Sequence, residues 1–73
     1  MMSGDQMKAA RKFLGWSQLT LAAEAGLDPA TIALFETGKK QMSDGHRWKV
    51  LRALSDAGVT FVDGKPVPAR RER

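Results

Sequence analysis

The stretch GWSQLTLAAEAGLDPATIALFETGKK, residues 15–40, carries the start and stop signals of two short helices joined by a tight turn. Ser17 can cap the first helix, because its hydroxyl can accept a hydrogen bond from a free backbone N–H of the first turn. Gly26 can end that helix in the left-handed conformation. In the second helix, Asp28 can serve as the cap at the start and Gly38 can end the helix in the left-handed conformation. Because two short helices cannot bury a core by themselves, we expect this pair to be the working part of a larger helical domain.

Two further helices are predicted, one on each side of this pair. The first covers about residues 5–14, with Ser3 or Asp5 as its cap, and the last covers about residues 43–57. The side chains expected to face inward recur at helical spacing and are Met7, Ala10, Leu14, Leu21, Ala22, Ala25, Ile32, Phe35, Trp48, Leu51 and Leu54. The sequence therefore predicts an all-α domain of four helices over residues 1–58.

Residues 59–73 change character and form a β-prone segment with a basic tail. The dipeptide Asp63-Gly64 is a strong signal for a two-residue hairpin turn, which would pair residues 59–62 with residues 65–68. The last four residues, 70–73, are expected to be disordered.

The register of this hairpin gives its two edges different properties. Pro66 and Pro68 fall where a strand N–H would point away from the partner strand, so they would block the outer edge of their own strand. The edge formed by Val59, Phe61 and Val62 stays free to pair with another copy of the chain. The alternative is that Phe61 folds back onto the last helix and closes the core of a monomer.

The composition argues against several classes of protein. The 73 residues suffice for one small domain, which buries only about 60% of the surface that its unfolded chain exposes. The absence of Cys excludes disulfides, zinc–cysteine sites and thiol nucleophiles. The single His has no second ligand nearby, and no carboxylate cluster or phosphate-binding glycine loop is present, so we expect no metal, no cofactor and no enzyme activity. No run approaches the ~18 apolar residues of a membrane span, and no signal peptide is recognisable, so we expect a soluble, cytoplasmic protein.

The net charge of +4 is distributed unevenly along the chain. Residues 17–37 contain three acidic residues and no basic one, whereas the segments before and after them are net positive. A basic domain can bind nucleic acid or an acidic membrane surface. The alternative is a merely solvated surface, which the charge alone does not exclude.

A set of residues at fixed spacing gives the chain a family resemblance. These residues are Arg11, Leu14-Gly15-Trp16-Ser17-Gln18, Leu21-Ala22, Ala25-Gly26-Leu27, Thr31-Ile32 and Phe35-Glu36-Thr37-Gly38-Lys39. With them the chain resembles the phage-repressor-like helix-turn-helix proteins of the Xre, or Cro/cI, type over about residues 5–58. The resemblance implies a four-helix lambda-repressor-like fold, and it implies that Trp16 and Trp48 belong to the core.

The resemblance also implies roles for individual residues. The helix over residues 28–37 would lie in the major groove of DNA. Arg11 would pair with Glu36 and tie the first helix to the third. Gln18 would contact a phosphate at the start of the second helix, where free backbone N–H groups also attract an anion. The full set of expected DNA-binding residues is Ser17, Gln18, Asp28, Pro29, Ala30, Thr31, Ala33, Leu34, Lys39 and Lys40.

The chain departs from these relatives on the outer face of the helix over residues 28–37. Such proteins usually carry several polar side chains there, whereas this face carries Pro29, Ala30, Ala33 and Leu34. In one interpretation these residues recognise thymine methyl groups by apolar contact, and phosphate contacts and DNA shape supply the rest. In the other, the apolar face binds a protein and DNA recognition has been lost. We favour the first, since the residues expected to contact phosphate are placed together beside this face.

These observations predict a sequence-specific regulator of transcription that binds double-stranded DNA. It would act as a repressor that occupies an operator as a homodimer, associated with the nucleoid. Two alternatives are the antitoxin of a toxin–antitoxin pair, which would also bind its own promoter, and a protein-interaction or architectural module. No small-molecule effector is evident. Arg70, Arg71 and Arg73 would add nonspecific attraction to phosphate or only solubility.

Overall fold

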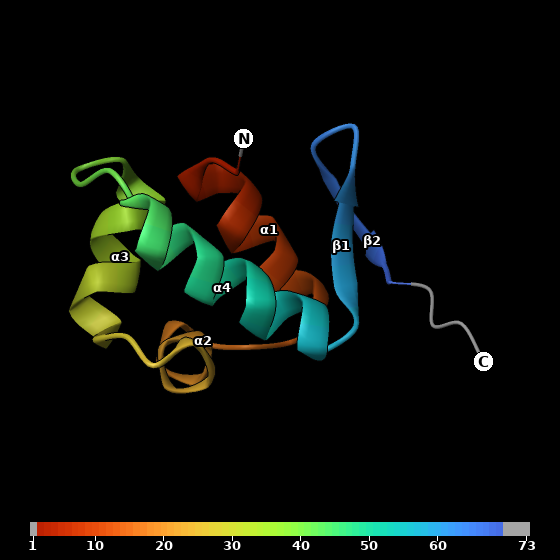
Figure 1. Cartoon of the computed structure of the whole chain (residues 1–73), viewed down its shortest axis with the longest axis horizontal. Coiled ribbons are helices and arrows are strands. Elements are labelled where there is room, and N and C mark those ends of the chain that lie inside the picture. Colours follow the sequence, from red (N-terminus) through yellow and green to blue (C-terminus); the bar gives the residue numbers. More distant parts are fainter. Residues whose placement is uncertain (1, 70–73) are drawn as a thin grey trace.

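The computed structural model describes residues 2–69, which form four helices followed by a hairpin (Figure 1). In chain order the elements are α1 (Gly4–Phe13), α2 (Gln18–Ala25), α3 (Pro29–Thr37), α4 (Asp44–Asp56), β1 (Val59–Val62) and β2 (Lys65–Pro68). The prediction of an all-α fold with a short β segment after it is confirmed. The expectations of disorder and of a role for the arginines at 70, 71 and 73 lie outside the described residues.

Each helix begins at a side chain that accepts a hydrogen bond from a backbone N–H of the first turn. These N-cap residues are Ser3, Ser17, Asp28 and Ser43. Ser3, rather than Asp5, caps α1, and the Gln6 side chain bonds back to the Ser3 N–H to complete a capping box. Because the caps fix where the helices start, the helix bounds differ from the predicted ones by about one residue.

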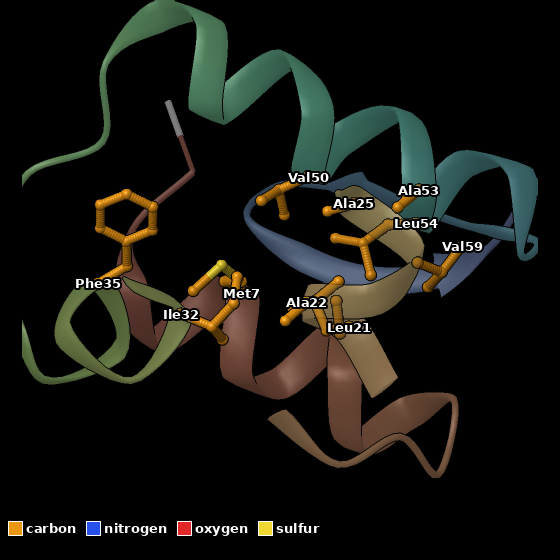
Figure 2. Packing of buried hydrophobic residues seen from close by; sticks show 11 residues of the cluster. Met7, Leu21, Ala22, Ala25, Ile32, Phe35, Val50, Ala53, Leu54 and Val59 are labelled. Carbon is orange, nitrogen blue, oxygen red and sulfur yellow. The ribbon is translucent and has the colours of Figure 1, made fainter. Parts of the chain in front are cut away.

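The hydrophobic core lies between the helices and is extended by the hairpin (Figure 2). Its buried side chains are Met7, Ala10, Leu21, Ala22, Ala25, Ile32, Phe35, Val50, Ala53, Leu54 and Val59. Leu14, Trp16 and Phe61 are half-buried and pack against this cluster. Val59 is only 1% exposed, so β1 contributes a side chain to the same core as the helices.

The prediction for the inner face of α4 was wrong for two residues. Trp48 is 60% exposed and Leu51 is 37% exposed, while Val50, Ala53 and Leu54 face the core. The apolar residues of α4 fit two overlapping stripes along the helix, one with Trp48 and Leu51 and the other with Val50 and Ala53. Packing against the rest of the fold buries the second stripe. Since two residues along a helix are about 200° apart around its axis, burying Val50 turns Trp48 outward. There the Arg52 guanidinium lies 5.4 Å from the centre of the indole ring.

The hairpin has the predicted register. Val62 pairs with Lys65, and the turn residues Asp63 and Gly64 have φ of 53° and 77°, as a tight turn matched to the strand twist requires. The Ala69 N–H donates to the Gly58 carbonyl at 2.8 Å and extends the pairing beyond the strands. The hairpin stands at the opposite end of the molecule from α3, beside α1 and the end of α4 (Figure 1).

Candidate nucleic-acid interface

The helix α3 presents one buried face and one face directed away from the core. Ile32, Phe35 and Glu36 are buried. At its start, Asp28 Oδ1 accepts from the Ala30 N–H at 2.9 Å, and Pro29 takes the first helical position, where the lack of an N–H loses no intrahelical bond. At its end, Gly38 has φ of 78° and closes the helix in the left-handed conformation.

The outer face of α3 is small and apolar. Pro29 and Ala30 are exposed, Thr31 and Ala33 are half-buried, and Leu34 is 39% exposed. The exposed carboxylate at the cap is the only charge among the α3 residues expected to bind DNA. Short side chains let a helix backbone approach a surface closely. This face therefore favours close fit and contacts with methyl groups over hydrogen bonds from long polar side chains.

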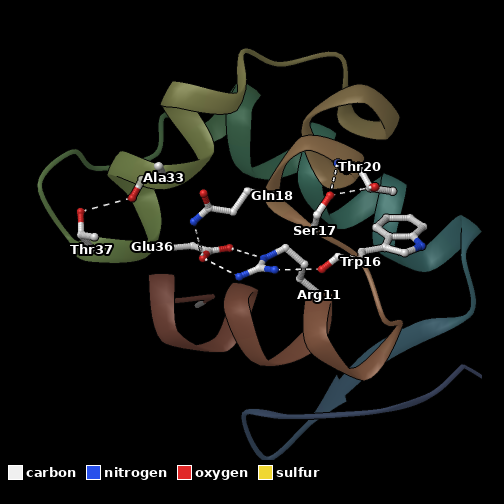
Figure 3. Close-up of polar contacts among 8 residues, drawn as sticks. All are labelled: Arg11, Trp16, Ser17, Gln18, Thr20, Ala33, Glu36 and Thr37. Atoms are coloured by element: carbon white, nitrogen blue, oxygen red, sulfur yellow. Dashed lines mark hydrogen bonds and ion pairs between the residues drawn. The ribbon is translucent and has the colours of Figure 1, made fainter.

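A buried ion pair joins α1 to α3 beside this face (Figure 3). Arg11 Nε lies 2.8 Å from Glu36 Oε2, and Arg11 Nη2 donates to Glu36 Oε1 at 3.0 Å. The two side chains are 10% and 3% exposed. Arg11 Nη1 also donates to the carbonyl of Trp16 at 2.8 Å, so the pair is anchored to the segment just before α2.

Gln18, the first residue of α2, joins the same cluster. Its Nε2 donates to Glu36 Oε1 at 3.0 Å, so the carboxylate accepts from both Arg11 and Gln18 (Figure 3). Burial alone would raise the pKa of Glu36, but the hydrogen bonds from Arg11 and Gln18 and the positive charges of Arg11 and Lys8 outweigh it. The pKa of Glu36 therefore lies below its ordinary value of 4.5.

The N-terminus of α2 leaves backbone donors available. The Ser17 hydroxyl accepts from the Thr20 N–H at 3.1 Å and lies 3.0 Å from the Thr20 hydroxyl, a bond in which either oxygen can be the donor. The backbone N–H groups of Gln18 and Leu19 have no acceptor within residues 2–69. A phosphate at this point would meet these backbone N–H groups and the Gln18 side chain, and also the Ser17 hydroxyl when Thr20 supplies the proton between the two hydroxyls.

Two exposed lysines follow α3. The N–H groups of Lys39 and Lys40 donate to the Leu34 carbonyl at 3.0 and 3.3 Å, which fixes the backbone of the loop against the end of the helix. Their side chains are exposed and form no ion pair within the described part of the chain. The loop thus holds two free ammonium groups close to the end of the apolar α3 face.

Residues 7–55 match a family model described as helix-turn-helix. The chain belongs to the phage-repressor-like helix-turn-helix family. Membership supports a DNA-binding regulator of transcription, and this family is not normally enzymatic. No curated protein matches the chain.

Within this helix-turn-helix chain, α2 and α3 form the motif, and the matched segment covers the Arg11–Glu36 pair as well as Gln18 and Lys39. The hairpin lies after the matched segment, although its Val59 belongs to the helix-turn-helix core. No group of three or more metal-ligating side chains occurs among residues 2–69. In the same range no helix is long and apolar enough to cross a membrane.

Sequence reasoning missed one contact of this helix-turn-helix site. It assigned Gln18 to phosphate and Glu36 to Arg11, but not Gln18 to Glu36. The two residues are 18 positions apart and lie on different helices, so no periodicity links them. The only available signal was that both belong to the set of residues that carries the family resemblance.

Proposed function

We propose that this protein is a sequence-specific repressor that occupies a double-stranded DNA operator as a homodimer. One observation carries the proposal: the outer face of α3 is small, and groups able to attract an anion lie at the start of α2, which Gln18 links to Glu36 of α3, and directly after the end of α3. These groups are the start of α2 and the loop with Lys39 and Lys40. Occupancy of an operator needs no chemistry beyond this interface, and it would place the protein in the cytoplasm at the nucleoid.

In this proposal most of the affinity comes from phosphate contacts. Lys39, Lys40, Gln18 and the free N–H groups at the start of α2 would bind the DNA backbone and set the position of α3 in the major groove. These contacts are independent of sequence, and each neutralised phosphate releases counterions. The acidic cap Asp28 would be repelled by phosphate, but its carboxylate could accept from the amino group of a cytosine.

Specificity would come from the apolar face of α3. Ala30, Ala33 and Leu34 can contact thymine C5-methyl groups, and Thr31 can reach backbone or base. Since small side chains bring α3 close to the base edges, the width and deformability of the groove would also be sensed.

The free edge of the hairpin supports the dimer. Val62–Lys65 and Gly58–Ala69 are hydrogen-bonded pairs, and in an antiparallel hairpin such pairs alternate with pairs whose backbone groups point away from the partner strand. The N–H groups of Val59 and Phe61 belong to the second kind, so they point to the outer edge of β1. A second β1 could pair there through its backbone, although the Val59 side chain is buried and cannot itself contribute. Because the hairpin and α3 lie at opposite ends (Figure 1), this pairing leaves α3 clear for DNA.

The test is a binding-site selection from random duplexes, followed by titration of the selected and a shuffled duplex at two salt concentrations. We expect the selected duplex to bind more tightly at both. Lys39→Ala should weaken both duplexes about equally and flatten the salt slope by about one unit. Equal affinity for the two duplexes would contradict sequence-specific binding.

A further inference from the structure

We propose that Glu36 is a positioning residue for DNA binding, which holds the Gln18 side chain with one amide N–H free for a phosphate. The inference rests on the proposed function and adds a second role for Glu36 beyond its pair with Arg11. Within residues 2–69, Gln18 is the only polar side chain at the start of α2 that forms a hydrogen bond to α3.

The hydrogen-bonding capacity of the amide decides how Gln18 can contact DNA. Its Nε2 lies 3.0 Å from Glu36 Oε1, and the Glu36 side chain is only 3% exposed. A primary amide has two N–H donors, so one remains after the other is given to Glu36. Gln18 is half-buried rather than buried, so the remaining donor is within reach of a phosphate at the start of α2.

The charge of Glu36 also fixes which way round the amide lies. Turning the Gln18 amide over would place its oxygen against the carboxylate, and two acceptors cannot bond each other. Figure 3 shows the Gln18 oxygen directed away from Glu36. Glu36 therefore keeps the nitrogen, and with it the free N–H, at a fixed place between α2 and α3.

Glu36 is itself held by groups that do not depend on DNA. Arg11 donates to both of its oxygens, at 2.8 and 3.0 Å, and to the Trp16 carbonyl at 2.8 Å. A free Gln side chain loses considerable rotamer freedom when it is ordered. Because this network orders Gln18 before DNA arrives, less of that entropy is lost on binding.

A double-mutant cycle separates positioning from folding. The variants are Gln18→Met, which keeps the side-chain stem and removes the amide, Glu36→Gln, and the double variant. A Gln at position 36 carries no charge and has one acceptor oxygen where Glu36 has two, so its bond to Gln18 is weaker than that of the carboxylate whichever way its amide lies. Affinity is measured for a duplex selected by the wild-type chain, at a temperature where circular dichroism shows all four proteins folded.

We expect Gln18→Met to weaken binding about tenfold, as the loss of one hydrogen bond to a charged group would do. Glu36→Gln should weaken binding about threefold or more in the wild-type background and by less than about twofold in the Gln18→Met background. An equal loss in both backgrounds, or no loss in the wild-type background, would overturn the inference.

A second measurement keeps the inference testable when Glu36→Gln does not fold. The two Gln18 side-chain amide protons are assigned in the wild-type NMR spectrum by their disappearance in Gln18→Met. On addition of the selected duplex, the proton bonded to Glu36 should keep its shift and the other should move. The inference would be overturned if the chemical shift of the proton bonded to Glu36 changed to that of a free amide, or if neither proton changed its chemical shift.

The two proposals fail in different ways. A wild-type chain that selects no duplex contradicts the proposed function, whatever the amide protons do. A chain that selects a duplex but gives an additive cycle retains the proposed function and loses the positioning role of Glu36.

Discussion

Gly4, the first residue of α1, lies directly against the backbone carbonyl of Phe35 in the last part of α3. A Cβ at Gly4 would overlap that oxygen and come within 3.0 Å of the Glu36 Cα. Gly4 and Arg11 are seven residues apart and so lie on the same side of α1. The absence of a side chain at Gly4 thus lets α1 approach α3 closely enough for Glu36 to reach Arg11.

Gly4→Ala is therefore expected to destabilise the fold by about 1–3 kcal/mol, because a backbone carbonyl cannot move aside as a flexible side chain can. The measurement is thermal unfolding, where each kcal/mol corresponds to about 4–8 °C in Tm for a domain of this size.

Gly45→Ala is the matched control. Gly45 lies in the first turn of α4, and a Cβ there would meet only the Ser43 hydroxyl at 3.9 Å. Since Gly is less favourable than Ala in a helix by about 0.5–1 kcal/mol, this variant should be unchanged or slightly more stable. If both alanine variants melt at the same temperature, the close contact of α1 with α3 is wrong.

Breaking the Arg11–Glu36 pair should cost about 3–5 kcal/mol, because either partner alone is left as a buried, unpaired charge. Arg11→Met and Glu36→Gln are the variants, and loss of the folded signal in urea is the measurement. The double variant strands no charge, so it should be less destabilised than the sum of the two single variants. Unchanged midpoints for both single variants would show that the pair does not stabilise the fold.

Stability should fall with acid in a way that depends on Glu36. Its pKa is lowered in the folded chain, so the unfolded chain takes up this proton at higher pH than the folded chain does. The contribution of Glu36 is therefore present above its ordinary pKa and is lost as the pH falls through the lowered value. We expect Tm to decrease more steeply between about pH 6 and pH 3 for the wild type than for Glu36→Gln. Parallel Tm profiles for the two proteins would refute this assignment.

The dimer can be tested at one backbone group. Phe61→Pro and Phe61→Ala both remove the ring, but only the proline removes the N–H at the outer edge of β1. In sedimentation at tens of micromolar, on the order of the affinity expected of a small interface, Phe61→Ala should remain a dimer and Phe61→Pro should not. Truncation after Gly58 is a poorer test, because it also deletes the buried Val59 side chain. If Phe61→Pro stays dimeric, the exposed outer face of α4 with Trp48 becomes the better candidate.

Local signals predicted most of the fold. The caps Ser17 and Asp28, the terminating glycines and the Asp63-Gly64 turn depend on neighbouring residues only, and the helices and hairpin lie where these signals put them. Trp48 was misplaced because the periodicity of α4 allowed two stripes, and packing against the rest of the fold selects one of them.

The candidate site was less predictable for a related reason. The need for glycine at position 4 and the bond from Gln18 to Glu36 arise only when α1, α2 and α3 are brought together. Both contacts join residues that are far apart in sequence, and neither leaves a pattern in the local sequence.

Recognition of DNA by the apolar α3 through thymine methyl groups, as we propose, is tested most directly by one comparison. The selected duplex is compared with a copy in which uracil replaces each thymine, which removes only the C5-methyl groups. A buried methyl group contributes about 0.8 kcal/mol, so the wild type should bind the uracil duplex about fourfold more weakly for each methyl contacted, and Leu34→Ala should lose less. Equal affinity of the wild-type protein for the two duplexes would contradict this proposal.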